Sequence, residues 1–400
     1  MPEQVRVVEI IYSFGIEGTG GGAGRFGAEL GRRLDRSRFE AAVCGLWDLG
    51  TRFEQERIAE LRKIGVNAFT ATPWDGCRPL RSLWRAFVRI RRELLSRPPH
   101  LIHSHSEFAD VVALLLKLSL KTPAILRTVH NGHPLEWRKR PLRRLLFTNL
   151  LYPLFYDQEI GVNQDITYRL NRRWLARRLG RQAICRHNAI DLARFMNLRI
   201  DIPEKRRTLG IPPAAFVVGN IGRMVEGKGQ EILIEAAALV LKTLPEAFFV
   251  LVGDGELAGA LSQQARSSGV YDRTLFTGPR TDVEEVLACF DLCVIPSLWE
   301  GISTVILESM ASGIPVVATD IPGSRELLEA GRSAWLVPAG QPQALADAIL
   351  TAWREPRQRQ VYAHRAREAV RKFSLDAIVR QHEEVYLALS KGRSIVVAGA

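Results

Sequence analysis

Short apolar runs of strand-forming residues alternate with helical runs along nearly the whole chain. The strand candidates of the first half are Val5–Tyr12, Ala41–Trp47, Leu101–Ser104, Ala124–Val129, Glu159–Val162 and Ala183–Arg186. A second series consists of Phe216–Ile221, Ala247–Val252, Arg273–Phe276, Leu292–Ile295, Pro315–Thr319 and Ala334–Val337. Strands that alternate with helices of about 10–15 residues form βαβ units, in which helices cover both faces of a parallel sheet. The sequence therefore predicts an α/β fold with doubly wound parallel sheets.

The strand series restarts near Pro212-Pro213, after a polar and irregular stretch at Asn197–Lys205. A chain of 400 residues also exceeds what one hydrophobic core usually supports. We predict two Rossmann-like domains, residues 1–198 and 199–373, with ligands at the carboxyl ends of the strands. Residues 374–400 contain a further helix at Ser374–Leu389, which we expect to pack back toward the first domain.

Cysteine usage and the amino terminus bear on the compartment. Five cysteines are few and odd in number, which argues against a disulfide framework and favours a reducing compartment. We expect Cys289 and Cys293 to be buried structural residues, because no second pair completes a zinc set. The first residues lack a signal peptide pattern, and no uncharged apolar run reaches about 18 residues. We expect a cytoplasmic protein, with a peripheral position on the cytoplasmic membrane face as a further option.

Positive charge is concentrated in the first half of the chain. Residues 1–200 contain 34 Lys and Arg against 19 Asp and Glu, whereas the rest contains 21 against 24. Nucleic acid, anionic lipid or an acidic substrate would explain this excess, and so would a solvated arginine-rich surface. The stretch 138–156 is basic and then strongly apolar. It fits an anionic membrane surface and a core helix equally well.

A glycine-rich loop, Gly222–Gly229, follows one predicted strand and precedes a helix. It nearly matches the phosphate loop of nucleoside triphosphatases, but Gly229 occupies the position of the Mg²⁺-binding Ser or Thr. We therefore favour a different use, in which Arg223 and Lys228 together hold a diphosphate without a metal.

The stretch Glu300–Gly313 forms a second candidate site. Ser303 is a plausible N-cap of a helix at Thr304–Ser312, with Gly313 just after the helix. The backbone N–H groups at the start of such a helix would face an anion; these are the amides of Gly301, Ile302 and Ser303. Of the two carboxylates, Glu308 would hold a ribose diol and Glu300 a sugar.

Two further patterns leave alternatives open. Gly18–Ala23 follows the first strand and satisfies a dinucleotide-binding pattern, although Asp48 lies too far along to serve well as its acidic partner. His103 and His105 share one face of a strand end. No third metal ligand is evident beside them, so we favour packing or acceptor contact over a metal site.

The stretch SLWEGISTVILESMASGIPVVATDIPGSRELL resembles the donor-site segment of the retaining GT-B glycosyltransferases of family 4 (GT4). The two glutamates of that segment, with seven residues between them, match Glu300 and Glu308. GNIGRMVEGKG, LVGDGE and FTGPR resemble the glycine loop, the strand-end turn and the segment beside the base. In the first half, GTGGGAG, LRTVHN and RHNAIDLARF are similar to further family elements. Two departures are Gly24, where many members have Glu, and Ala189, where Gly is common.

This resemblance implies a function and a set of site residues. It implies a retaining hexosyltransferase that moves a sugar from a nucleoside diphosphate-sugar to an acceptor hydroxyl, by a front-face reaction assisted by the leaving phosphate. The implied catalytic residues are His130, Arg223, Lys228 and Glu300. The implied donor-binding residues are Gly21, Gly22, Gly222, Gly253, Asp254, Gly255, Arg280, Gly301, Ile302, Ser303, Thr304 and Glu308.

The resemblance also implies the setting. The first domain would bind the acceptor and the second the donor, in a GT-B fold whose domains face each other across a cleft. We expect no metal and no cofactor, since no D-x-D pair occurs. The expected partners are the nucleotide-sugar, a glycan or lipid-linked acceptor and an anionic membrane surface, with no nucleic acid, in cell-surface polysaccharide or glycolipid synthesis. The alternatives are an NAD-type oxidoreductase and a non-catalytic nucleotide-sugar or membrane-surface binding protein.

Overall fold

The computed structural model describes residues 4–15, 21–74, 79–130 and 144–393. The chain divides into two compact units: residues 1–188 together with 376–400, and residues 189–375. The domain limits expected at 198 and 373 stay predictions. Among the described helices, none combines the length and apolarity that a bilayer span requires.

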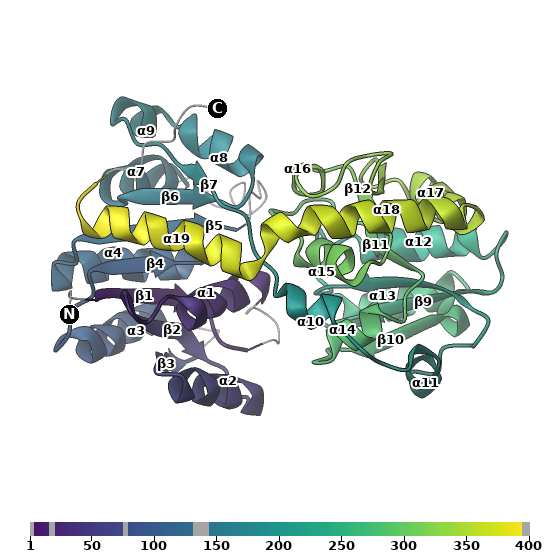
Figure 1. Ribbon diagram of the computed structural model, residues 1–400, viewed down its shortest axis with the longest axis horizontal. Coiled ribbons are helices and arrows are strands. Elements are labelled where there is room, and N and C mark those ends of the chain that lie inside the picture. The colour runs from purple at the N-terminus through teal and green to yellow at the C-terminus, as the bar shows by residue number, and fades with distance from the viewer. Residues whose placement is uncertain (1–3, 16–20, 75–78, 131–143, 394–400) are drawn as a thin grey trace. The chain divides into compact units, whose positions relative to one another are not determined.

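The first unit contains a seven-stranded sheet in which every pair of neighbouring strands is parallel, in the order β3-β2-β1-β4-β5-β6-β7 (Figure 1). Its strands are β1 (Val5–Ile11), β2 (Phe39–Asp48), β3 (Asn67–Pro73), β4 (Leu101–Ser104), β5 (Ala124–Val129), β6 (Gln158–Gly161) and β7 (Ile184–Cys185). The sequence did not predict β3, because this edge strand contains a single large apolar residue, Phe69. The other six strands lie within two residues of their predicted positions.

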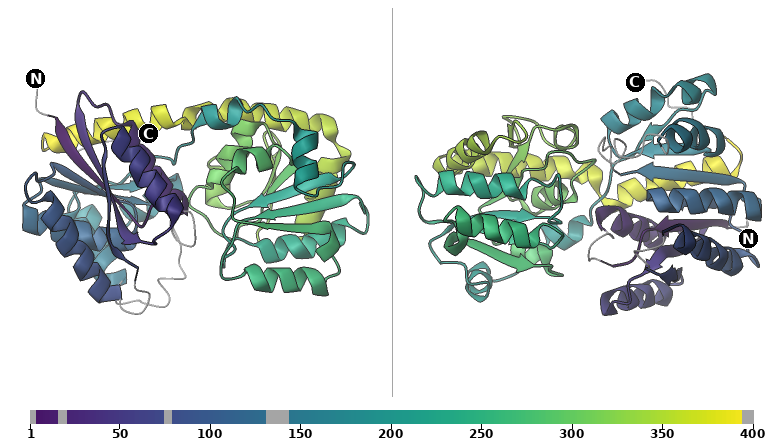
Figure 2. Two further views of the ribbon diagram at one scale, coloured as in Figure 1. Left: turned by 90° about the horizontal axis from the view of Figure 1, so that it is seen from below. Right: turned by 180° about the vertical axis from the view of Figure 1, so that it is seen from behind.

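Helices cover both faces of this sheet (Figure 2). They are α1 (Gly21–Arg33), α2 (Arg52–Lys63), α3 (Pro79–Leu94), α4 (Glu107–Leu120), α7 (Tyr152–Phe155), α8 (Gln164–Asn171), α9 (Trp174–Arg178) and the C-terminal α19 (Leu375–Ser390), with a π-helix η1 (Arg144–Leu151) before α7. On one face, the buried core includes Ile10, Trp47, Ile90 and Ile125. Removing such apolar surface from water is the main stabilising contribution.

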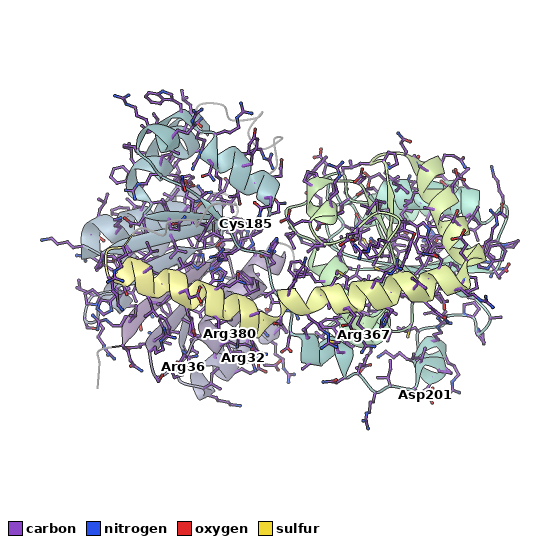
Figure 3. All side chains as sticks on the ribbon, turned by 45° about the horizontal axis from the view of Figure 1, so that its top comes forward. Arg32, Arg36, Cys185, Asp201, Arg367 and Arg380 are labelled. Atoms are coloured by element: carbon purple, nitrogen blue, oxygen red, sulfur yellow. The ribbon has the colours of Figure 1, made fainter. Side chains whose placement is uncertain are left out.

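The C-terminal helix α19 belongs to the first unit through contacts with the end of α1. Arg33 forms an ion pair with Asp376 at 2.9 Å, and the amide of Asp35 donates to the Glu383 carboxylate at 2.8 Å. Figure 3 labels Arg32 and Arg36 at this end of α1, beside Arg380 of α19. Segments more than 340 residues apart in the sequence are therefore joined here.

The second unit contains a six-stranded sheet, also parallel throughout, in the order β10-β9-β8-β11-β12-β13. Its strands are β8 (Phe216–Ile221), β9 (Ala247–Val252), β10 (Thr274–Gly278), β11 (Leu292–Ile295), β12 (Val316–Thr319) and β13 (Trp335–Val337). All six were predicted within two residues. The predicted α/β class, with two doubly wound parallel sheets, is confirmed.

The helices of the second unit are α10 (Leu192–Met196), α11 (Ile202–Thr208), α12 (Gln230–Val240), α13 (Ala258–Ser267), α14 (Val283–Leu287), α15 (Thr304–Ser312), α16 (Pro322–Arg325), α17 (Pro342–Arg354) and α18 (Pro356–Ala369), with short 3₁₀ turns η2 (Tyr271–Arg273) and η3 (Val370–Phe373). The core joins α12 and α17 to the sheet through residues such as Leu233, Phe249 and Ile349. Cys289 and Cys293 are buried, as expected.

The strand order reverses direction between β1 and β4 in the first unit and between β8 and β11 in the second. Chain segments that leave these two adjacent strands run to opposite sides, which opens a crevice at the carboxyl ends of the strands. Loops after β8 and β11 are therefore the expected place for a ligand in the second unit, and loops after β1 and β4 in the first.

Candidate functional site

The loops after β8 and β11 pack tightly against each other because glycines remove the side chains that would separate them. Gly229 has a φ of 71°, and a Cβ at this position would overlap the carbonyl oxygen of Pro296. The amide of Leu298 donates to the carbonyl of Gly227 at 2.8 Å. This contact positions the predicted basic loop directly beside the predicted acidic loop.

Lys228 and Glu300, both predicted catalytic residues, meet at this junction. The ammonium group of Lys228 forms an ion pair with Oε1 of Glu300. The Lys228 side chain is 24% exposed and that of Glu300 is 13% exposed. This partial burial strengthens the pair relative to one on the surface, yet leaves both groups within reach of a ligand.

Arg223 lies in the same loop, and its backbone is fixed. Its carbonyl oxygen accepts a hydrogen bond at 3.1 Å from the side-chain amide of the buried Gln230. Next to it, the amide of Met224 donates to the carbonyl of Asp254 at 2.8 Å. The guanidinium of Arg223 therefore extends from an anchored and partly exposed loop.

The turn at Gly253, Asp254 and Gly255 follows β9 and leans on the same loop. Gly253 has a φ of 132°, and a Cβ there would overlap the carbonyl oxygen of Gly222. Asp254 is exposed, and one of its carboxylate oxygens accepts from the amide of Gly255 at 2.7 Å. The structure thus gives these glycines a packing role that is independent of any ligand, and their predicted donor contact stays a prediction.

Helix α15 begins at Thr304, with Ser303 at the N-cap position and Gly313 in the left-handed conformation after the last turn, as predicted. The side chain of Ser303 makes no capping hydrogen bond. Gly301, Ile302 and Ser303 are buried at this helix start. Their amides lie at the positive end of the helix dipole and directly follow Glu300, the partner of Lys228.

Glu308 is 5% exposed and lies on the second turn of α15. A buried carboxylate needs nearby positive charge or hydrogen bonds. Arg194 of α10 supplies such a charge. Burial opposes the charged form of this arginine, but Glu284, Glu308 and Asp191 together outweigh it and raise the pKa of Arg194. Arg194 was not predicted as a neighbour of the site, because it lies before residue 198, in the part of the sequence assigned to the first domain.

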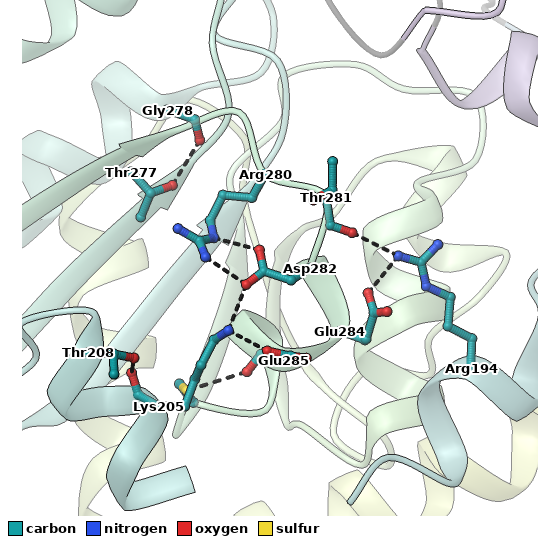
Figure 4. Close-up of polar contacts among 11 residues, drawn as sticks. Arg194, Lys205, Thr208, Thr277, Gly278, Arg280, Thr281, Asp282, Glu284 and Glu285 are labelled. Carbon is teal, nitrogen blue, oxygen red and sulfur yellow. Dashed lines mark hydrogen bonds and ion pairs between the residues drawn. The ribbon is translucent and has the colours of Figure 1, made fainter. Parts of the chain in front are cut away.

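Arg280 was predicted to line the base pocket, and the structure shows it in a charge network (Figure 4). Its Nε and one terminal nitrogen donate to both oxygens of Asp282 at 2.7 and 2.6 Å. Lys205 of α11 pairs with the same carboxylate and with Glu285. Hydrogen bonds from Arg280 hold the pKa of Asp282 well below its usual range. The bidentate pair fixes the guanidinium, and its contact with a ligand stays a prediction.

In the first unit, Gly21 and Gly22 open helix α1, as the glycine pattern predicted. Residues 16–20, which include the start of that pattern, lie outside the described residues. His130 directly follows β5. Its Nε2 lies 3.2 Å from Nδ1 of His105, and burial lowers the pKa of His130 well below its usual value.

His103 and His105 do share one face, with ring centroids 4.0 Å apart. A third group beside them is Glu9 of β1, which sequence reasoning missed. Glu9 pairs in register with His103 across the β1–β4 ladder. The available signal was a carboxylate within the run VVEII of β1, whose other residues are apolar, because a buried carboxylate requires partners.

Glu9, His103 and His105 offer three ligand atoms that lie within 4.8 Å of one another, so they form a candidate metal group. Direct hydrogen bonds already account for their geometry. Nε2 of His105 lies 2.7 Å and Nδ1 of His103 lies 3.1 Å from Oε2 of Glu9, and the Tyr386 hydroxyl donates to Oε1 at 2.7 Å. Each group is satisfied without an ion, so we interpret the cluster as a hydrogen-bonded network.

Two family profiles and several known glycosyltransferases resemble this chain in sequence. The sequence profile described as Glycosyltransferase Family 4 matches residues 20–193, and the profile described as Glycosyl transferases group 1 matches residues 215–355. A lipopolysaccharide core biosynthesis glycosyltransferase, LpsE of Rhizobium meliloti, is 37% identical over 185 residues, which are 46% of this chain and 52% of that protein. The UDP-Gal:alpha-D-GlcNAc-diphosphoundecaprenol alpha-1,3-galactosyltransferase of Escherichia coli is 24% identical over 280 residues, covering 66% and 69%.

Solved structures agree with the sequence matches. The structure of Anabaena HepE in complex with UDP-glucose superposes with a TM-score of 0.81 at 25% identity, over 96% of this chain and all of that one. WaaG, a glycosyltransferase involved in lipopolysaccharide biosynthesis, has a TM-score of 0.73 at 16% identity over 95% and 99%. The NAD-type oxidoreductase alternative is not favoured by any of these matches. The chain therefore belongs to glycosyltransferase family 4, has the GT-B fold and is a glycosyltransferase.

Proposed function

We propose that the protein transfers a sugar from a nucleoside diphosphate-sugar to a hydroxyl group of a glycan or lipid-linked acceptor, with retention of anomeric configuration. The observation that carries this proposal is the meeting of Lys228 and Glu300 at the carboxyl ends of β8 and β11. A cation for phosphate and a carboxylate for sugar hydroxyls stand side by side at the switch point of a parallel sheet. The related HepE was solved with UDP-glucose, which supports a nucleotide-sugar donor.

The proposed roles follow from the charge of each group. Arg223 and Lys228 hold the diphosphate, with help from the amides at the start of α15. Glu308 accepts hydrogen bonds from the ribose diol and Glu300 from the sugar. In the structure, Glu300 pairs with Lys228. Donor binding therefore exchanges one anionic partner of Lys228 for another, which keeps the cation paired throughout.

We propose a front-face reaction, in which the acceptor attacks from the side on which the diphosphate leaves. The bond between the anomeric carbon and the diphosphate oxygen breaks, and the acceptor oxygen bonds to the same face of that carbon. The acceptor proton passes to the leaving diphosphate. Two fixed cations and oriented amides stabilise the charge that develops on the leaving group, which is the largest catalytic contribution in such sites. This arrangement assigns no role to a metal or cofactor.

For the acceptor side, we propose contact with an anionic membrane surface. Relatives include a lipopolysaccharide core biosynthesis mannosyltransferase, an alpha-D-GlcNAc-diphosphoundecaprenol galactosyltransferase and a phosphatidyl-myo-inositol mannosyltransferase, and these names support a lipid-linked acceptor. The stretch 138–156 lies partly outside the described residues. Its described part keeps Tyr152 buried and exposes four leucines, here called the leucine patch: Leu145, Leu146, Leu150 and Leu154.

Helix α3 offers a second surface of this kind. Leu80, Trp84 and Val88, spaced four residues apart, are 82%, 60% and 38% exposed. Arginines at positions 81, 85, 89 and 92 flank this stripe and are exposed too. Apolar side chains bordered by cations match the acyl boundary and the charged headgroups of an anionic lipid layer.

Incubation with a panel of UDP-, GDP- and ADP-sugars and lipid-linked acceptors tests the reaction. The proposal predicts release of nucleoside diphosphate and an NMR spectrum in which the product keeps the donor's anomeric configuration. An inverted product would contradict retention.

Sedimentation with vesicles containing phosphatidylglycerol tests the membrane contact. Trp84→Gln and Leu146→Gln should each reduce binding at low salt, whereas Val361→Gln, an exposed apolar residue of the second unit, should not. Equal binding of all three variants and the unchanged chain would reject this surface.

A further inference from the structure

A chain of buried hydrogen bonds links Glu9 to His130 through His105, inside the first unit. Oε2 of Glu9 lies 2.7 Å from Nε2 of His105, and Nδ1 of His105 lies 3.2 Å from Nε2 of His130. Adjacent strands carry the three groups: β1 holds Glu9, His105 follows β4, and His130 follows β5. Phe26 of α1 contacts both imidazole rings edge-on and keeps them in place.

The direction of these hydrogen bonds is determined at the Glu9 end. Burial would raise the pKa of Glu9, but the neighbouring His103 and His105 outweigh burial and hold that pKa well below its usual range. An ionised carboxylate has no proton to donate. Nε2 of His105 must therefore carry the proton that it shares with Glu9.

The protonation of His105 in turn determines which nitrogen of His130 carries a proton. Burial and the nearby His103 lower the pKa of His105 to about 4, so its ring is neutral at physiological pH. A neutral imidazole has one donor nitrogen and one acceptor nitrogen. Because Nε2 of His105 is the donor, its Nδ1 is the acceptor, and Nε2 of His130 must donate to it.

One nitrogen of His130 is then left with a free lone pair. His130 is also neutral, since burial lowers its pKa, so its Nδ1 is unprotonated. Among the described residues, this buried Nδ1 has no hydrogen-bond partner. The side chain of Asn188 lies next to His130 and favours its protonated form, but burial and the neighbouring His105 and His103 outweigh this effect. The Oδ1 of Asn188 is likewise buried without a partner among the described residues.

We infer that Glu9 and His105 are positioning residues that fix His130 in a single tautomer, with Nδ1 presented as a hydrogen-bond acceptor for a substrate hydroxyl group. Helix α19 supports this arrangement, because Tyr386 donates to the other oxygen of Glu9 and accepts from His103. The inference rests on the proposed transfer reaction and on the catalytic role that the family resemblance implies for His130. It adds that Glu9 sets the direction of these hydrogen bonds, although His105 and His130 lie between Glu9 and the substrate.

Nitrogen NMR of the full chain, labelled with ¹⁵N-histidine, tests the tautomer directly. His130→Gln identifies the His130 signals by their loss. At neutral pH we expect a protonated Nε2, an unprotonated Nδ1 and a coupling across the hydrogen bond from Nε2–H of His130 to Nδ1 of His105. A proton on Nδ1 of His130, or a doubly protonated ring, would overturn the inference. This measurement requires no catalytic activity, so it is independent of the proposed function.

The variant His105→Phe tests the consequence. We expect the protected Nε2 proton signal of His130 to disappear and kcat to fall by about tenfold or more, with an unchanged KM for the nucleotide-sugar. Thr128→Val is the matched control. It removes the 2.7 Å hydrogen bond between Thr128 and His103 in the same cluster but leaves the path from Glu9 to His130 intact, so both the His130 signal and kcat should stay within about twofold.

The outcomes separate the two claims. The expected tautomer in a chain that transfers no sugar to any acceptor would reject the proposed function and retain the tautomer. An active chain in which His105→Phe and Thr128→Val lower kcat equally would reject the positioning role. If His105→Phe does not fold, the coupling between Nε2–H of His130 and Nδ1 of His105 in the unchanged chain tests the tautomer on its own.

Discussion

Lys228 and Glu300 lie 72 positions apart in the sequence and form an ion pair at the junction of two loops of the second unit. Glycine-dependent packing of the loops after β8 and β11 creates the contact. The pair joins the residue proposed to neutralise the diphosphate to the residue proposed to hold the sugar. Each therefore controls the charge that the other presents to the donor.

Removing either proposed diphosphate cation should slow the reaction. We expect Lys228→Ala and Arg223→Ala each to lower kcat/KM about 10²-fold or more, because a partner of the leaving group is lost. Steady-state kinetics with the best donor of the panel measures this. Lys242→Ala is the control, since Lys242 is exposed just beyond α12. Unchanged rates in Lys228→Ala and Arg223→Ala would remove both residues from the site.

The substitution Glu300→Gln should have opposite effects on binding and turnover. In the free chain the Glu300 carboxylate competes with phosphate for Lys228, so its neutral counterpart should bind the free nucleoside diphosphate about two- to fivefold more tightly. The value of kcat should fall, because the sugar loses a charged acceptor. Calorimetry gives the Kd of the nucleoside diphosphate and kinetics on the same preparation give kcat. Weaker diphosphate binding in Glu300→Gln would contradict competition between Glu300 and phosphate for Lys228.

Glu308→Ala should weaken nucleotide binding through the ribose and not through the phosphates. We expect the Kd of the nucleoside diphosphate to rise about tenfold, while the Kd of inorganic pyrophosphate stays unchanged. Folding should be affected less, since Arg194 retains its 2.6 Å contact with Glu284. Calorimetry with both ligands decides, with the exposed Glu329→Ala as control. Equal weakening of both ligands would point to a loss of structure.

Gly229→Ala should disturb the junction more than a comparable substitution elsewhere. Gly229 and Gly210 have similar φ values of 71° and 73°, but only at Gly229 would a Cβ overlap another group, the carbonyl of Pro296. Both substitutions carry the cost of a positive φ. We expect Gly229→Ala alone to weaken nucleoside diphosphate binding, in addition to a larger fall in the free energy of unfolding. Urea titration and calorimetry compare Gly229→Ala with Gly210→Ala. Equal stability and equal nucleoside diphosphate binding in the two variants would contradict the role of the loop contact in the site.

Acid should destabilise the first unit through its buried histidines. Burial lowers the pKa of His105 and of His382 to about 4, and it lowers those of His103 and His130 as well. The unfolded chain therefore binds protons that the folded chain excludes as pH falls below about 6.5. The free energy of unfolding should fall between about pH 6.5 and 4, by about 1.4 kcal/mol per pH unit for each proton taken up.

Two buried carboxyl groups, Asp110 and Glu54, act in the opposite direction. Burial raises the pKa of Asp110 to about 6 and also raises the pKa of Glu54, so their contributions are present at low pH and are lost as pH rises. These two groups do not offset four histidines. Urea titrations across this range should show a shallower slope for His382→Leu and an unchanged slope for His364→Gln, whose imidazole is exposed. A free energy of unfolding that stays constant from pH 7 to 4 would contradict buried neutral histidines.

Local patterns predicted much of the donor side. Apolar runs predicted twelve strands, and Ser303 with Gly313 predicted the ends of α15, because strand periodicity and helix ends depend on nearby residues. The role of Glu9 could not be predicted in this way. It depends on the register of β1 with β4 and on Tyr386, which lies 377 positions away. The pairing of Lys228 with Glu300 and the neighbours of Glu308 likewise depend on how loops and helices pack.

A thermal-shift titration with UDP-, GDP- and ADP-sugars and with NAD tests the central claim most directly. The proposed diphosphate site predicts that at least one nucleotide-sugar stabilises the unchanged chain in a concentration-dependent manner, and that Lys228→Ala removes this shift. Stabilisation by NAD alone, or a nucleotide-sugar shift that is the same in Lys228→Ala, would contradict it.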